Sequence, residues 1–308
     1  MTSGFVIRWL RPALLAGFIA ACHPAPPPAL PPSAPAAASR IVTLSPHLAE
    51  LAYSAGAGDR LVGVVEFSDF PPPVAKLPRV GDAFRVDYEA VAALKPDLIL
   101  AWTSGNPPET VQRLRDLGFR VVSLEPAGLA DIGAEVAEIG ALAGTAPAAN
   151  VAAAQFESRL AALRAGAQGA APLTVFVQLS ERPYFTVTDQ HFLGQGLRLC
   201  GGRNVFGTLP GLTAIVALES ILEAAPAVII ASDMGATGDS PLAGWARWKN
   251  LPAVKRGNLY ALNADLLSRP SMRILDGVAG LCAILDEARS KGASPVGGAS
   301  APISGDRG

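Results

Sequence analysis

The chain is poor in the side chains that most metal-binding and catalytic sites need. Its 308 residues include only three histidines and three cysteines, and aromatic residues make up 6% of the total. Histidines and carboxylates do not cluster with metal-ligand spacing, and the sequence has no Gly-x-Ser-x-Gly turn, spaced carboxylate pair or complete phosphate-binding loop. We therefore expect no catalytic residue, no metal site and no resident cofactor.

Charge of either sign is also scarce. The sequence has 25 basic and 26 acidic residues, a formal net charge of −1 and no basic run. A nucleic-acid-binding surface needs concentrated lysine and arginine, so we expect no nucleic-acid partner. Half of the residues are apolar, which is enough for a substantial folded core.

The apolar run near the N-terminus is too short to span a bilayer. Arg8 and Arg11 precede this run at residues 12–21, an arrangement typical of a secretory signal. The run ends in Ile-Ala-Ala-Cys22, which resembles a bacterial lipobox, where the cysteine is acylated after cleavage. The alternatives are an ordinary signal with an incidental Cys22, or cleavage near Ala38. Each version predicts export to the periplasm, and the lipobox predicts a membrane-tethered lipoprotein.

The other two cysteines, Cys200 and Cys282, form an even pair in an exported chain and so predict a disulfide. Closing a loop of roughly 80 residues would stabilise the fold by on the order of 4 kcal/mol in the chain-entropy model. The alternative is a pair of buried thiols too far apart to bond.

Strand and helix patterns alternate along two stretches of the chain. The first stretch has apolar runs at residues 41–45, 61–65, 96–102 and 120–124, with helical patterns at 88–94 and 111–117. Runs that are apolar on both faces are typical of a parallel sheet covered by helices. The same order restarts at residues 174–180. Between the two stretches, strong helix formers at 146–166 predict one long helix.

An internal repeat connects the two stretches. Glu89 opens a segment with a short helix, Pro96 and a buried strand, and Glu219 opens a second segment with the same spacing to Pro226. We therefore predict an α/β fold of two similar Rossmann-like lobes with parallel sheets, joined by one long backbone helix. A ligand is expected between the lobes, where loops follow the carboxyl ends of the strands.

Composition predicts the domain organisation of the whole chain. Proline and alanine dominate the segment before the first lobe, and glycine, serine and proline dominate the C-terminal segment. The predicted parts are a signal peptide at 1–21, a lipid-anchored tether at 22–39, a first lobe at 40–145, a connecting helix at 146–170, a second lobe at 171–288 and a flexible tail at 289–308.

Five sequence blocks carry a resemblance to a known family. They are IVTLSP at 41–46 followed by Glu50 and Leu51, FSDFPP at 67–72, ALKPDLILAW at 93–102, CGGRNVF at 200–206 and Leu-Cys at 281–282. In this order, and over nearly the whole folded body, they resemble the cobalamin-binding branch of the class III, helical-backbone periplasmic solute-binding proteins of ABC importers.

The resemblance implies that a corrinoid lies between the lobes, held by aromatic faces and by polar groups at its rim. The implied or candidate contacts are Phe67, Phe84, Trp102, Phe185, Asp265, Leu266, Leu267, Ser268 and Arg269. Tryptophans of the family are replaced here by Ala83, Thr213 and Leu266, and Phe84 is a substitute for one of them.

The resemblance also implies a partner. Glu89 and Glu219 match the family's docking carboxylates, which meet arginines on the permease. The alternative is that each acid only complements the dipole at the start of its helix. The expected partners are an ABC permease with its ATPase, the corrinoid as transported ligand, and a membrane through the lipid anchor alone.

Two other functions stay open on the sequence. One is a ferric siderophore or haem receptor of the same fold, in which Tyr184 or His191 would bind the haem iron. The other is an enzyme on a similar two-lobed scaffold, which would need a catalytic constellation or cluster cysteines that the chain lacks. Trp245 and Trp248 are expected to pack in the core.

Overall fold

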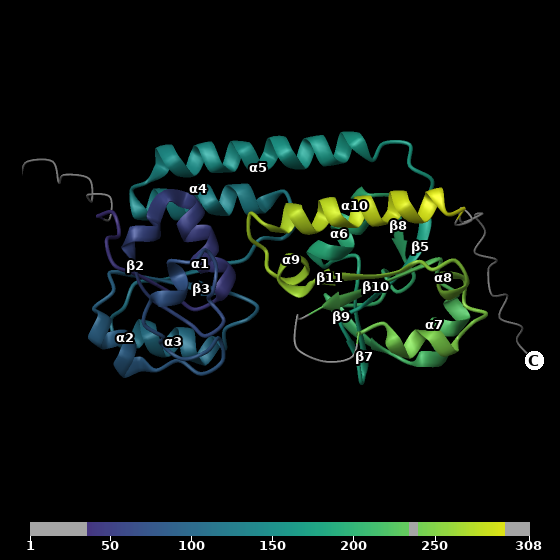
Figure 1. The fold of residues 1–308 in the computed structure, drawn as a ribbon. Helices are drawn as coiled ribbons and strands as arrows, with labels where there is room; N and C mark the ends of the chain where they lie inside the picture. Colours follow the sequence, from purple (N-terminus) through teal and green to yellow (C-terminus); the bar gives the residue numbers. More distant parts are fainter. Residues whose placement is uncertain (1–35, 234–239, 293–308) are drawn as a thin grey trace, which may run out of the picture. The chain divides into compact units, whose positions relative to one another are not determined.

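A computed structural model describes residues 36–233 and 240–292. Within residues 37–308, which form one unit by their contacts, the strands make two parallel four-stranded sheets and one small antiparallel sheet (Figure 1). The predicted α/β fold with two similar parallel-sheet lobes is therefore confirmed.

The first parallel sheet has the strand order β2-β1-β3-β4. Its strands are β1 (Ile41–Thr43), β2 (Leu61–Val64), β3 (Leu98–Trp102) and β4 (Val121–Leu124). The helices that accompany them are α1 (Pro46–Ala52), α2 (Tyr88–Leu94), α3 (Pro108–Asp116) and α4 (Asp131–Ala143). Side chains of β3 alternate between two apolar cores, since Leu98 and Leu100 join one cluster and Ile99 the other. The strands are apolar on both faces because helices cover both faces.

The second parallel sheet repeats this design with the order β11-β10-β5-β8. Its strands are β5 (Leu173–Gln178), β8 (Gly202–Asn204), β10 (Val228–Asp233) and β11 (Leu259–Asn263). Its helices are α6 (Phe192–Leu199), α7 (Leu218–Ala224), α8 (Pro252–Lys255), α9 (Ala264–Ser268) and α10 (Ile274–Ser290). Trp245 is buried and donates its indole N–H to Gln178 Oε1 at 2.7 Å, so it packs in the core as predicted.

The predicted repeat is visible in the backbone. Helices α2 and α7 each have seven residues, and each ends in a non-glycine residue with left-handed torsions. Lys95 has φ 46° and ψ 56°, and Ala225 has φ 43° and ψ 58°. A proline and a buried strand follow in both cases. The same unusual backbone at matching positions supports a common design for the two lobes.

Helix α5 (Ala146–Gly166) is the predicted long helix. It packs against α4 of the first lobe and against α10 of the second (Figure 1). Phe156 and Leu160 of α5 belong to one apolar cluster that includes strand residues of both lobes. The helix therefore shares a continuous core with both sheets.

The small antiparallel sheet was not predicted. It consists of β6 (Ser180–Glu181), β7 (Tyr184–Val187) and β9 (Thr213–Val216), in the order β6-β7-β9. Its strands have two to four residues, too few to show a clear alternation of apolar and polar positions. It lies next to the carboxyl end of β5, beyond the second parallel sheet.

A buried carboxylate joins the two lobes. Glu50 of α1 is only 3% exposed, and its oxygens accept hydrogen bonds from Arg273 Nε at 2.9 Å, Arg273 Nη2 at 2.6 Å and Ser271 Oγ at 2.6 Å. The guanidinium of Arg273 also lies over the ring of Phe70, 3.8 Å from its centroid. An acid of the first lobe is therefore paired with a base just before α10 of the second.

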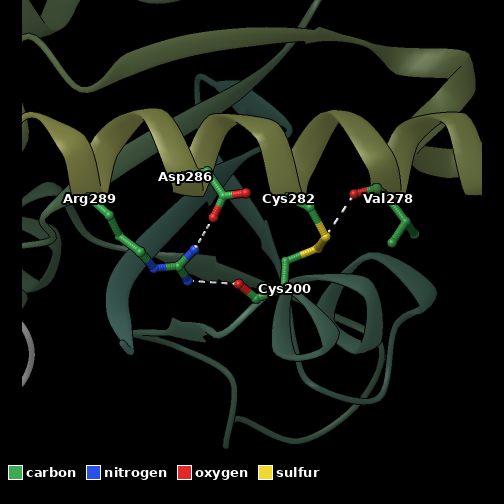
Figure 2. The surroundings of a disulfide bond; sticks show 5 residues. All are labelled: Cys200, Val278, Cys282, Asp286 and Arg289. Carbon is green, nitrogen blue, oxygen red and sulfur yellow. Dashed lines mark hydrogen bonds and ion pairs between the residues drawn. A yellow bond between two sulfur atoms is a disulfide. The ribbon is translucent and has the colours of Figure 1, made fainter. Parts of the chain in front are cut away.

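The predicted disulfide between Cys200 and Cys282 is formed (Figure 2). It connects the end of α6 to α10, with Cα atoms 4.8 Å apart and a sequence separation of 82 positions between the cysteines. Next to it, Arg289 donates to the carbonyl of Cys200 at 2.7 Å and pairs with Asp286 at 2.7 Å (Figure 2). The second lobe is thus closed covalently at its C-terminal helix.

Replacing both cysteines, Cys200→Ala with Cys282→Ala, should lower the free energy of unfolding by about 4 kcal/mol, because the unfolded chain regains the entropy of a long open loop. Urea denaturation of the oxidised wild type and the double variant measures this difference. Reductant should lower the wild-type midpoint and leave the variant unchanged. Equal midpoints for oxidised wild type and variant would contradict a stabilising disulfide.

Replacing Glu50 by Gln should lower the free energy of unfolding by about 3 kcal/mol, because the largely buried guanidinium of Arg273 loses its carboxylate partner and that of Arg269 loses one of three. The matched control is Asp276→Asn, which removes the carboxylate of the exposed ion pair with Arg159 and should cost at most about 1 kcal/mol. Urea denaturation of both variants gives the comparison. Equal losses would show that Glu50 contributes no more than a surface charge.

Candidate functional site

Arg269 is the predicted site residue with the most contacts between the two lobes. Its guanidinium pairs with Asp69 at 2.7 Å, Asp265 at 3.0 Å and Glu50 at 3.2 Å, and donates to the carbonyl of Phe67 at 3.1 Å. The side chain is 13% exposed. Burial alone would lower the pKa of Arg269, but the hydrogen bond with Asp69 and the nearby carboxylates raise it above its ordinary value. It is a fixed cation at the junction of two loops.

Asp69 is the counterpart of Arg269 on the first lobe. Partial burial would raise the pKa of Asp69, but the hydrogen bond and charge of Arg269 outweigh this and lower it. The carboxylate therefore stays charged at neutral pH. The predicted loop at residues 265–269 is thereby tied to the FSDFPP segment, a connection that the sequence did not reveal.

Phe67 is held by its backbone and leaves its ring in solvent. Its φ is 63°, in the left-handed region that bulky residues rarely adopt, and its side chain is 75% exposed. Backbone strain of this kind costs on the order of 1 to 3 kcal/mol and is retained where the surroundings fix it. The hydrogen bond from Arg269 to its carbonyl is such a constraint. The aromatic ring of Phe67 is therefore held in a defined position with its face exposed to solvent.

Phe84 is the second exposed aromatic ring of the first lobe, with a side chain that is 70% exposed. It belongs to the turn between Gly81 and Val86, where Asp82 Oδ1 accepts hydrogen bonds from the amides of Phe84 and Arg85, both at 2.7 Å. The turn therefore has a defined conformation that directs Phe84 away from the core.

Asn106 connects this turn to the predicted contact Trp102. Its Nδ2 donates to the carbonyls of Leu44 at 2.9 Å and Ala83 at 2.8 Å, and its Oδ1 accepts from the amide of Trp102 at 2.6 Å. Asn106 is buried and ties the ends of β1 and β3 to the turn that carries Phe84. Sequence reasoning missed it, because an isolated asparagine before two prolines resembles any loop residue.

Trp102 is half-buried and contacts His47 edge to face, with ring centroids 5.1 Å apart. Burial lowers the pKa of His47 to about 3, with a smaller contribution from the charge of Arg269. His47 is therefore neutral at physiological pH. Its Nδ1 lies 2.5 Å from Ser45 Oγ. His47 supports the indole of Trp102 from beneath and is not placed to bind a metal.

The second-lobe segment at residues 265–269 forms most of α9 and its C-terminal end. Asn263 Oδ1 caps the helix by accepting from the amide of Asp265 at 2.8 Å, and Ser268 Oγ bonds back to the carbonyl of Ala264 at 2.8 Å. The hydroxyl of Ser268 is thus occupied within the helix. Leu266 is half-buried, with its carbonyl against Gly277. The side chain of Leu267 lies outside the described residues.

Phe185 lies on β7 and is half-buried. It pairs across the small sheet with Ile215 of β9, whose side chain is 65% exposed. Leu212, just before β9, is also exposed. Leu212 and Ile215 are apolar candidates that sequence reasoning missed, because it did not predict this sheet. The structure gives no direct contact between Phe185 and the group around Arg269.

The two predicted docking acids occupy equivalent places. Glu89 lies in the first turn of α2 and Glu219 in the first turn of α7, and both are exposed. Glu89 also lines a surface hollow of about 620 Å³ with Arg113 and Phe119. The predicted lipidation residue Cys22, the signal segment, nearly all of the tether and most of the tail lie outside the described residues.

Within residues 36–233 and 240–292, no helix is long and apolar enough to cross a membrane. Likewise, the side chains in those ranges form no group of three or more histidines, cysteines and carboxylates that could hold a metal ion.

Several known proteins resemble this chain in sequence and fold. The family described as periplasmic binding protein matches residues 41–266. The vitamin B12-binding protein of Vibrio cholerae serotype O1 is 36% identical over 255 residues, which cover 82% of this chain and 91% of that protein. The corresponding protein of Pectobacterium carotovorum is 33% identical over 248 residues, or 80% of this chain and 88% of that one.

Among solved structures, the periplasmic vitamin B12 binding protein BtuF of Vibrio cholerae has a TM-score of 0.75 and 37% identity, covering 82% of this chain and 98% of that one. The heme-binding protein BhuT, in complex with two hemes, has a TM-score of 0.72 at 22% identity, covering 82% and 99%, and shows the shared fold alone. These matches confirm the predicted family and a transport component that is not an enzyme. The chain belongs to the periplasmic binding protein family.

Proposed function

We propose that this protein binds cobalamin between its lobes and delivers it to the permease of an ABC importer. The observation that carries the proposal is the 37% identity to a solved vitamin B12 binding protein over 98% of that chain. Relatives named as vitamin B12-binding proteins in other bacteria match over a similar length. The match includes both lobes, so it covers the segments from which a ligand site between them would be built.

The exposed aromatic rings support a bulky, partly apolar ligand. Phe67 and Phe84 present apolar faces to solvent from structured loops, and a corrin ring gains free energy by covering such faces. Trp102, Phe185 and Leu266 are half-buried and would add to the wall, with Leu267 as a further proposed contact. Asp265 and Ser268 would meet polar groups at the ligand rim.

Arg269 would act chiefly by holding the Phe67 loop. Its donors already have partners on Glu50, Asp69, Asp265 and the Phe67 carbonyl. A direct contact with ligand would use its remaining N–H groups or replace one of these partners. Either way, its position links the first-lobe aromatic ring to the second-lobe segment.

The second candidate is a haem receptor. The surroundings of its two candidate iron ligands, Tyr184 and His191, argue against it. Tyr184 is packed at 5.4 Å from Trp245 and 6.4 Å from Phe176, measured between ring centroids. His191 caps α6, where its Nδ1 accepts from the amide of Leu193 at 3.1 Å, and burial lowers its pKa to about 4. Both side chains already serve the fold of the second lobe. A ferric siderophore receptor stays an alternative to be tested alongside.

The proposal extends to membrane attachment, domain organisation and docking. Cys22 would carry the lipid that tethers the periplasmic protein, through a segment at 22–39, to a membrane. The first lobe would occupy 40–145, the connecting helix 146–170 and the second lobe 171–288, followed by the tail at 289–308. Glu89 and Glu219, one on each lobe, would meet basic residues of the permease, whose ATPase drives release.

Replacing Phe67 by Ala should weaken cobalamin binding about tenfold, because the lost stacking and apolar contact amount to about 1.4 kcal/mol. Isothermal titration calorimetry of wild type and variant measures the change, with cobinamide, haem and a ferric siderophore panel as rival ligands. Val151→Ala on α5, which also truncates an exposed apolar side chain, is the control and should bind normally. Unchanged affinity in Phe67→Ala would show that this ring does not contact the ligand. Stronger binding of haem or a siderophore would show that cobalamin is not the preferred ligand.

Reversing both docking charges, Glu89→Lys with Glu219→Lys, should abolish cobalamin uptake and stimulation of the ATPase while leaving ligand affinity unchanged. The reason is that the two carboxylates would attract permease arginines, whereas lysines repel them. Uptake in a strain lacking the wild-type protein gives the readout. The control is Asp59→Lys with Glu157→Lys, which makes the same change in net charge at other exposed positions. Normal uptake by the docking variant would show that the two acids only complement the dipoles of their helices.

A further inference from the structure

An acidic cavity lies in the first lobe, apart from the residues proposed to contact cobalamin. It has a volume of about 390 Å³ and is bounded by the segments that follow β3 and β4 and by the first turns of α4. Four carboxylates line it: Glu125, Asp131, Glu135 and Glu138. The last three are four and three residues apart on α4, so they lie along one face of the helix. No lysine or arginine lines the cavity.

Glu135 distinguishes this cavity from an ordinary acidic surface. Glu135 lines the cavity although it is only 6% exposed, and its Oε2, which is shielded from solvent, has no hydrogen-bond partner among the described residues. A buried carboxylate oxygen without a partner costs free energy of folding. Glu50, equally buried, has three donor residues around it. A positively charged partner would supply the missing hydrogen bond and offset the repulsion of the neighbouring acids.

The surroundings reinforce this conclusion. Burial raises the pKa of Glu135 to about 8, and the charges of Glu125, Glu138 and Asp131 add to the rise. Glu125 is partly engaged, because Ser104 donates to it through its amide at 2.8 Å and its hydroxyl at 3.1 Å. The charged groups identified around Glu135 are thus all acidic.

The shape favours an organic cation over a bare metal ion. The described side chains offer no set of three ligands arranged for a metal. The cavity is also large, equivalent to about a dozen water molecules at roughly 30 Å³ each. Leu124, Pro126 and Ala134 supply apolar wall between the carboxylates. An aliphatic chain with an ammonium group at each end matches this lining, because its methylene groups can contact the apolar wall while its ammonium groups pair with the carboxylates.

We propose that this cavity is a second ligand site, which takes a small aliphatic diamine or polyamine with one ammonium group paired to Glu135. The remaining carboxylates would hold the other ammonium group, and Leu124, Pro126 and Ala134 would cover the methylene chain. The site is independent of the cobalamin proposal, because it uses none of the same residues.

Calorimetry of the whole protein with putrescine and spermidine tests the site. Binding should tighten about tenfold between about pH 6.5 and about pH 8.5, because the carboxyl of Glu135 ionises over this range while an alkylammonium group stays charged. Glu135→Gln should weaken putrescine binding at least tenfold at the higher pH and remove most of the pH dependence. The control is Glu223→Gln, which neutralises an exposed acid on α7 of the second lobe and should bind normally.

Several results would overturn the proposal. They are the absence of measurable binding by either amine, equal binding by wild type and Glu135→Gln, and tighter binding of Ca²⁺ or Mg²⁺ that displaces putrescine. If Glu135→Gln does not fold, the pair Glu125→Gln with Asp131→Asn provides the test, since both side chains are exposed. That pair should also weaken putrescine binding at least tenfold, and unchanged affinity would rule out the site.

Discussion

The junction between the two lobes of this protein depends on one buried carboxylate. Glu50 lies on α1 of the first lobe, and the side chains that donate hydrogen bonds to it, Arg269, Ser271 and Arg273, all belong to the second. Charged groups taken out of water are costly unless each finds a partner with good geometry. The lobes therefore cannot separate at this point without exposing or stranding charge, which makes the junction a strong constraint on their relative movement.

The geometry of the proposed ligand site depends on this junction. Arg269 belongs to the Glu50 group and at the same time holds the carbonyl of Phe67, whose backbone is in a conformation that few residues of its size adopt. The exposed ring is thus positioned by a charge network that spans both lobes. A change in the network would move this exposed ring, so the proposed ligand binding and the contact between the lobes would be coupled through Arg269.

Much of the fold could be predicted because its signals are local. Buried strands such as Leu98–Trp102 are short apolar runs, the helix at Ala146–Gly166 is rich in strong helix formers, and the repeat around Glu89 and Glu219 preserves its spacing. The junction could not be predicted in the same way. Glu50 and Arg273 are 223 residues apart, and nothing in the sequence near either residue identifies the other.

The polar supports of the site escaped prediction for the same reason. Asn106 and Asp69 matter through Ala83 and Arg269, which are 23 and 200 residues away in sequence and become their neighbours only in the folded chain. The aromatic rings were easier to identify, since family motifs mark Phe67 and Trp102 directly. Sequence therefore indicated which groups could touch a ligand, whereas the structure indicated what holds them in place.

Glu50 and Glu135 show how environment decides the role of the same side chain. Both are almost fully buried in the first lobe, at 3% and 6% exposure. Glu50 is surrounded by donors of the second lobe and contributes to architecture, whereas Glu135 faces a cavity of other acids. An apolar residue at the second position would cost less free energy of folding than an acid, and a ligand that supplies positive charge would compensate for this cost.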